Sequence, residues 1–204
     1  MNQGMHHEII ATDKIFEGRV ISVFRDEVKL PDGRVTCWDR VGHPGAVGIV
    51  PLLPDGNVLM VRQFRNAAGG FLLEIPAGKL DQPEEPLECA RRELAEETGH
   101  SAAKMVKLAE FYNSPGFCNE YFHLYLGTDL VPAEGSTEEE EFLEVVEIPL
   151  DELTGMISSR AISDAKSIIG ISLTRLYLQG ALAAMEEPGC SPAGSPGKQC
   201  RREG

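Results

Sequence analysis

GKLDQPEEPLECARRELAEETGH, residues 78–100, combines a proline-containing loop with a helical segment. Apolar side chains recur at helical spacing from about Pro86 to Thr98. Gly99 follows at the position where glycine commonly ends a helix. The stretch therefore predicts a loop that leads into a helix of about three turns.

Three carboxylates lie close together on this predicted helix. Residues three and four apart are neighbours on a helix surface, so Glu93 and Glu97 share one face and Glu96 is near it. Unpaired, the three side chains repel one another, whereas Mg²⁺ or Mn²⁺ prefers such hard oxygen ligands. Spacing alone leaves two interpretations open, a solvated helix face and a metal site.

The longer pattern resembles the signature of the Nudix hydrolases, Gly-x5-Glu-x7-Arg-Glu-U-x-Glu-Glu-x-Gly-U, where U is a bulky apolar residue. One position departs from that signature, because His100 stands where an aliphatic residue is usual. The matching positions are Gly78, Glu84, Arg92, Glu93, Leu94, Glu96, Glu97 and Gly99.

The resemblance implies a metal-dependent active site. It assigns Glu93 and Glu97 as principal ligands of two or three Mg²⁺ or Mn²⁺ ions. Glu96 would be a further ligand or a catalytic group that orients water, and the carbonyl of Ala77 would join the metal shell.

The same resemblance implies structural roles for the other positions of the box. Arg92 would pair with a carboxylate such as Glu84 to hold the loop against the helix. Gly78 would let the loop backbone turn. Leu94 would be the bulky apolar residue of the box, and Gly99 would end the helix.

Flanking segments resemble the ADP-ribose pyrophosphatase branch of that family, and the resemblance covers roughly residues 15–180. It implies hydrolysis of ADP-ribose to AMP and ribose 5-phosphate. Two alternatives stay open: a broader nucleoside-diphosphate-sugar hydrolase acting on ADP-sugars or GDP-mannose, and a non-catalytic nucleotide-sensing module. The segments are HPGAVGIVPL (43–52), VRQFR (61–65), FLLEIPAG (71–78) and NSPGFCNE (113–120).

Five residues outside the box are candidate substrate contacts. Arg62 and Arg65 alternate with apolar residues, so they either form the exposed face of a strand or touch phosphate. Pro115 and Gly116 either form a plain turn or belong to the substrate site. Phe117 either stacks on adenine or packs in the core or on a strand.

The acidic run Thr137–Glu141 has two interpretations. Charge runs commonly form solvated loops. In the branch that the chain resembles, an acidic loop at this place supplies the catalytic base. We therefore expect Glu139 to be the base, with Glu141 as the second candidate.

The order of expected elements indicates an α/β (α+β) domain. Alternating residues from Lys14 to about Val50 predict antiparallel strands around the turn at Pro31. The resemblance implies a Nudix fold, in which a mixed central sheet is sandwiched between helices. We divide the chain into an N-terminal β-sheet region (1–45), a Nudix domain (46–185) and a disordered tail (186–204). Further strands are expected at 46–53, 57–64, 71–78, 104–112, 121–130 and 142–150, and a final helix at about 164–185.

Composition limits the partners of the chain. The formal net charge of −13 opposes binding to nucleic acid. No run approaches the ~20 apolar residues of a membrane span, and the five scattered cysteines fit reduced thiols. We therefore expect a cytoplasmic enzyme of a small nucleoside diphosphate. The resemblance also implies a homodimer with crossing N-terminal strands.

Overall fold

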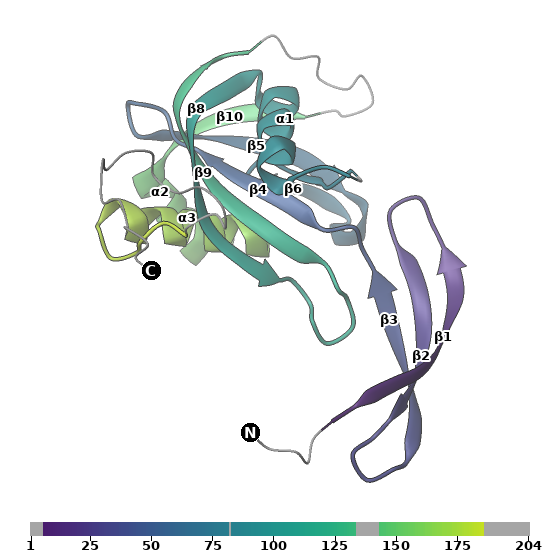
Figure 1. The fold of residues 1–204 in the computed structure, drawn as a ribbon. Coiled ribbons are helices and arrows are strands. Elements are labelled where there is room, and N and C mark those ends of the chain that lie inside the picture. Colours follow the sequence, from purple (N-terminus) through teal and green to yellow (C-terminus); the bar gives the residue numbers. More distant parts are fainter. Residues whose placement is uncertain (1–5, 82, 134–142, 186–204) are drawn as a thin grey trace, which may run out of the picture.

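The computed structural model describes residues 6–81, 83–133 and 143–185. An antiparallel sheet of order β1-β2-β3 opens the chain and projects from the rest of the molecule (Figure 1). Its strands are β1 (Glu8–Glu17), β2 (Ser22–Lys29) and β3 (Val35–Gly42). The expected turn at Pro31 joins β2 to β3, and Gly33 there has a φ of 86°. Strand β1 begins before Lys14, where the pattern predicted the first strand to start.

Two further sheets form the larger part of the molecule. The larger sheet has the order β7-β4-β9-β8, and only its β4–β9 pair is parallel. The other is antiparallel, in the order β10-β5-β6. The strands are β4 (Ala46–Pro51), β5 (Asn57–Arg65), β6 (Gly70–Glu74), β7 (Ala77–Lys79), β8 (His100–Tyr112), β9 (Tyr121–Pro132) and β10 (Glu144–Pro149), with the 3₁₀ helix η1 (Asn66–Ala68) between β5 and β6.

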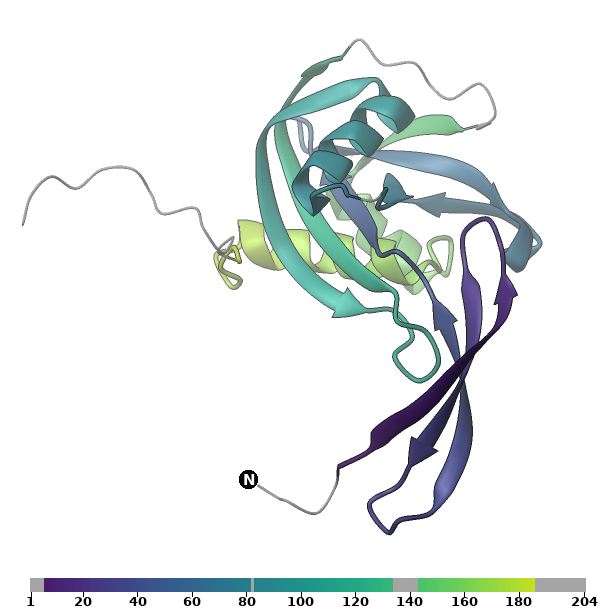
Figure 2. The same cartoon turned by 45° about the vertical axis from the view of Figure 1, so that its right-hand side comes forward.

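Helices cover both faces of the mixed sheet. Helix α1 (Pro86–Thr98) contacts β4, β7 and β8, while α3 (Ala165–Leu178) contacts β4, β8 and β9. Helix α2 (Leu150–Ser158) packs against α3 (Figure 2). The predicted mixed sheet between helices, with an N-terminal antiparallel sheet, is confirmed.

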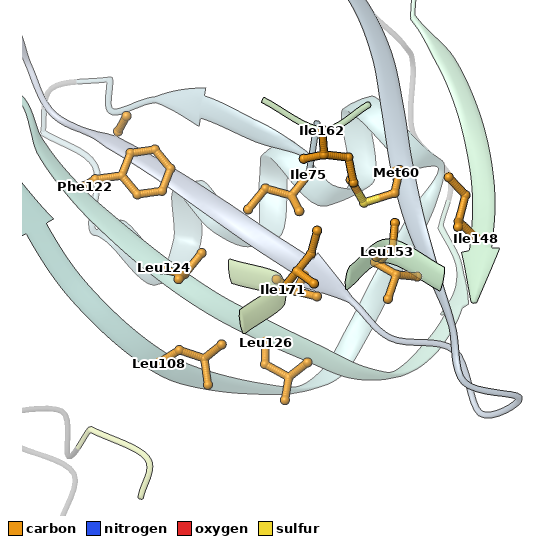
Figure 3. Close-up of a cluster of buried hydrophobic side chains, with 13 residues drawn as sticks. Met60, Ile75, Leu108, Phe122, Leu124, Leu126, Ile148, Leu153, Ile162 and Ile171 are labelled. Atoms are coloured by element: carbon orange, nitrogen blue, oxygen red, sulfur yellow. The ribbon is translucent and has the colours of Figure 1, made fainter. Parts of the chain in front are cut away.

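Two apolar clusters hold these layers together. The cluster on the α3 side includes Ile75, Leu124 and Ile171, all fully buried (Figure 3). The cluster on the α1 side joins Leu94 of the helix to Tyr125 of the sheet. Burying each such side chain contributes about 1.5–3 kcal/mol, so α1 is anchored firmly behind its charged face.

Three local expectations differ from the structure. The strand predicted for 142–150 ends at Pro149, and a helix that periodicity did not predict begins at Leu150. The last helix stops at Leu178, because Gly180 adopts a left-handed φ of 71° soon after it. The segment 71–78 divides between two sheets around Pro76, which has no N–H to donate to a strand ladder.

Strand β3 ends at Gly42 and β4 begins at Ala46, while the division of the chain near residue 45 stays a prediction. The predicted disordered tail, 186–204, lies outside the described residues. Of the helices in the described ranges, none is both long and apolar enough to cross a membrane.

Candidate active site

Helix α1 presents its carboxylates to a cavity because its opposite face is buried. Leu94 packs into the apolar cluster against the sheet. Gly99 ends the helix with a φ of 68°, and its N–H donates to the carbonyl of Ala95 at 2.9 Å. Glu93, Glu96 and Glu97 line a cavity of about 400 Å³, which we call the acidic cavity. The spacing of the box thus delivers three carboxylates to one site.

Strand β7 closes tightly over this part of the helix. The N–H of Ala77 donates to Oε2 of Glu97 at 2.9 Å, and the Glu97 residue is only 4% exposed. A Cβ atom on Gly78 would overlap the carboxylate of Glu93. Glycine at this position therefore leaves room for the Glu93 carboxylate where the structure places it, a role in addition to the loop turn that the sequence suggested.

Arg92 connects the loop to the helix. Its Nε and Nη2 donate to the two oxygens of Glu84, both at 2.9 Å. Its Nη1 donates to Glu93 and to Glu96, each at 2.8 Å. The two-point pairing lowers the pKa of Glu84 to about 2. The pairing expected between Arg92 and Glu84 is therefore present.

A second network places two cations beside the acidic cavity. Arg65 donates to Glu74, with Nη2 to Oε2 at 2.7 Å, and the Glu74 side chain is only 2% exposed. Nζ of Lys166 lies 2.6 Å from the same oxygen and 3.0 Å from Asp164. A buried carboxylate needs such partners, because an unpaired buried charge is costly.

Helix α3 fixes this network in position. The side chain of Asp164 caps the helix by accepting from the N–H of Ser167 at 3.0 Å. The hydroxyl of Ser167 accepts from the N–H of Ile75 at 2.8 Å. Arg65 and Lys166 also line a neighbouring cavity of about 440 Å³, which we call the basic cavity. The two cavities adjoin, because both are lined by Arg65, Ala77, Gly78 and Lys79.

Strand alternation separates the two arginines of VRQFR. Gln63 and Arg65 line the acidic cavity, as expected for residues two apart on a strand. Arg62 instead pairs with Glu144 at 3.5 Å and lies over the ring of Phe71, 5.3 Å from its centroid. The structure therefore brings one of these two arginines to the acidic carboxylates.

The other candidates lie elsewhere. Pro115, Gly116 and Phe117 line a separate cavity of about 460 Å³ together with Trp38 and Arg40 of the N-terminal sheet. Glu139 and Glu141 lie outside the described residues. Periodicity did not single out Gln63, Glu74 or Lys166. Of these three residues, only Gln63 could have been found from the sequence, because it lies two residues before Arg65 on the same predicted strand.

The acidic cavity suits a divalent cation by its donor chemistry. Three carboxylates face it, and Gly78 leaves room for that of Glu93. Within the described ranges, however, no three His, Cys, Asp or Glu side chains are already arranged to hold a metal ion. Arg92 engages Glu93 and Glu96 instead, so these carboxylates would have to reorient to bind a cation.

Fold, box and cavity together are those of a Nudix protein. The NUDIX domain matches residues 42–168, and the chain belongs to the Nudix family. The ADP-ribose pyrophosphatase of Bacillus subtilis (strain 168) is 40% identical over 186 residues, which are 90% of this chain and 100% of that protein.

Two other proteins are similar along most of their length. The methanol dehydrogenase activator of Bacillus methanolicus is 38% identical over 184 residues, 89% of this chain and 98% of that protein. The crystal structure of an ADP compounds hydrolase matches with a TM-score of 0.79 and 23% identity, over 88% of this chain and 98% of that chain. At that identity the structure shows a common fold.

The Arg92–Glu84 pair predicts a defined acid sensitivity. The pKa of Glu84 is lowered from 4.5 to about 2, so its stabilisation is complete above about pH 4.5 and is lost as the pH falls toward 2. Glu84→Gln is expected to lower the free energy of unfolding at pH 7 by about 2 kcal/mol. Urea unfolding between pH 7 and pH 2 should show this difference shrink in acid.

Glu88→Gln is the control, because Glu88 is an exposed glutamate in the first turn of α1, close in sequence to Glu84. It should leave the free energy of unfolding unchanged within about 0.5 kcal/mol. A Glu84→Gln deficit that stayed constant over the whole pH range would contradict this account of the ion pair.

Proposed function

We propose that this chain hydrolyses the diphosphate of ADP-ribose to AMP and ribose 5-phosphate, with Mg²⁺ or Mn²⁺ as the cofactor. The observation that carries the proposal is the junction of the two cavities, where three α1 carboxylates adjoin Arg65 and Lys166. The full-length similarity to an ADP-ribose pyrophosphatase favours this substrate among diphosphates.

The acidic residues have assigned roles in this proposal. Glu93 and Glu97 are the principal metal ligands, with Glu96 and the carbonyl of Ala77 as further ligands. Bound divalent cations would neutralise the diphosphate and make water more acidic. Glu139, or in second place Glu141, takes the proton from the attacking water, and Glu96 is the alternative group that orients it.

The basic residues hold the substrate. Arg65 donates to phosphate oxygens while Glu74 keeps its guanidinium in place, and Lys166 adds a second positive charge. Water attacks one phosphorus in line, the bond to the bridging oxygen breaks, and two monophosphates leave. Arg62, Pro115, Gly116 and Phe117 stay predicted substrate contacts from the sequence.

The N-terminal sheet supports a homodimer in this proposal. Every residue of β1 is exposed, including Ile9, Ile15 and Phe16, which are 54–60% exposed. An apolar surface of this kind is typical of an interface. We propose the cytoplasm as the location, as the sequence suggests.

Sedimentation velocity tests the proposed dimer. At micromolar concentration the species should have twice the mass of the 22.3 kDa chain. Ile15→Asp should shift it toward monomer, because a buried unpaired charge costs several kcal/mol. Wild-type protein that sediments as a monomer would contradict the dimer.

A substrate panel tests the proposed reaction. With Mg²⁺, AMP should be released from ADP-ribose faster than nucleotide is released from ADP-glucose, GDP-mannose or NADH. Clear turnover of GDP-mannose without turnover of ADP-ribose would instead favour the broader nucleoside-diphosphate-sugar hydrolase. Absence of turnover of all four would favour the non-catalytic module.

Glu97→Gln tests the metal site. Loss of one negative ligand is expected to lower kcat for ADP-ribose by about 10²-fold. The affinity for Mn²⁺, followed by electron paramagnetic resonance, should fall as well. Glu88→Gln is the control on the exposed side of the same helix, and equal kcat in the two variants would contradict the assigned ligand.

Gly78→Ala tests the close approach of β7 to α1. The added methyl group must displace the Glu93 carboxylate, and a shift of about 1 Å at a reacting centre can cost about 10²-fold in rate. Gly155→Ala is the control, because a Cβ atom there meets nothing within 4 Å. Gly78→Ala with wild-type kcat and Mn²⁺ affinity would contradict a requirement for the Glu93 carboxylate to lie against Gly78 during catalysis.

A further inference from the structure

The turn between β1 and β2 reaches the acidic cavity of the same chain. The N–H of Gly18 donates to the carbonyl of Ile21 at 2.8 Å, which closes the turn and places Arg19 and Val20 at its tip. Both residues line the cavity that Glu93 and Glu97 line. Figures 1 and 2 show this turn at the end of the N-terminal sheet that lies nearer to the other two sheets.

The other cations of the acidic cavity already have carboxylate partners. Arg65 is bound to Glu74, and Arg92 to Glu84. Lys79 is paired with Asp81 at 2.5 Å. These partners hold the three side chains in place and offset much of their charge.

Arg19 differs from these three residues. Its side chain is exposed, and within residues 6–81, 83–133 and 143–185 it makes no hydrogen bond or ion pair. It therefore brings an uncompensated positive charge to a cavity whose carboxylates would otherwise repel an anionic substrate. A guanidinium can donate two parallel hydrogen bonds to a phosphate group, which an ammonium cannot.

We propose that Arg19 is a further substrate-binding residue that donates to the diphosphate of the nucleotide. The inference rests on the proposed function and deepens it. The N-terminal sheet would then contribute to the catalytic site of its own chain through this turn, besides any role in dimerisation. Arg19 would contact the phosphates from the turn, in the cavity that the carboxylates of α1 also line.

The contact has a kinetic signature. No other residue of the described ranges holds Arg19. Its side chain would therefore become ordered when substrate binds, and would contact it in the ground state and the transition state alike. Uniform binding of this kind changes KM rather than kcat. Metal affinity should change little, because Arg19 lines the acidic cavity as a cation and is not among the proposed metal ligands.

Arg19→Ala is the principal test, with three measurements. These are KM and kcat for ADP-ribose, calorimetric Kd for α,β-methylene-ADP with Mg²⁺, and Kd for Mn²⁺ alone. Loss of a hydrogen bond to a charged group is expected to raise KM and the analogue Kd by about 10- to 100-fold. The kcat and the Mn²⁺ Kd should stay within about threefold. Arg19→Lys should be intermediate, because it keeps the charge but loses the paired donors.

Arg34→Ala is the matched control for net charge. Arg34 follows the β2–β3 turn at the far end of the same sheet and pairs with Asp32 at 2.6 Å. Arg34→Ala should leave KM and the analogue Kd within about twofold of the wild-type values, since an exposed ion pair contributes little to stability.

Two results would overturn the inference. One is an Arg19→Ala variant that matches Arg34→Ala in KM and in analogue Kd. The other is an Arg19→Ala variant whose Mn²⁺ Kd rises as much as its KM and its analogue Kd. Wild-type protein that releases no AMP from ADP-ribose would overturn the proposed substrate instead. A raised analogue Kd in Arg19→Ala would still support Arg19 as a diphosphate contact in that case.

Discussion

The guanidinium of Arg92 is the contact on which the geometry of the acidic cavity depends. It binds both oxygens of Glu84 in the loop and one oxygen each of Glu93 and Glu96 on the helix. Three carboxylates on one helix face repel one another, and a cation among them offsets that repulsion. The same contacts fasten the loop to α1, so a single side chain keeps the acidic groups close together and holds the loop beside them.

The positions of Arg65 and Lys166 depend on a buried charge. Glu74 is almost fully buried, and it binds Arg65 and Lys166 together. A buried carboxylate is tolerated only with such partners, so the cost of burial also determines where the two cations lie. Helix α3 carries Lys166, and the hydrogen bond from Ile75 to Ser167 fixes that helix relative to the sheet. Packing of the α3 layer is thereby linked to the position of positive charge beside the α1 carboxylates.

Local sequence patterns predicted helix α1 well, but they predicted little of how the neighbouring strands and helices pack around it. The spacing of Glu93, Glu96 and Glu97 is a property of one helix, and the observed helix has the predicted bounds, Pro86–Thr98. Helix α2 was not predicted, because its nine residues directly follow a strand and give a short periodic signal. Arg62 and Arg65 were equivalent by sequence. Only the packing of β5 against α1 decided which of them faces the carboxylates.

By itself, the sequence determined the family through the resemblance of its box. It also determined helix α1 and the acidic residues that share one face of it, because contacts three and four residues apart repeat within every helix. Tertiary structure alone decided that Lys166 meets Glu74 and that the turn carrying Arg19 opens onto the same cavity as α1. Such contacts join segments far apart in the chain. They depend on how sheets and helices pack, and no local periodicity encodes that packing.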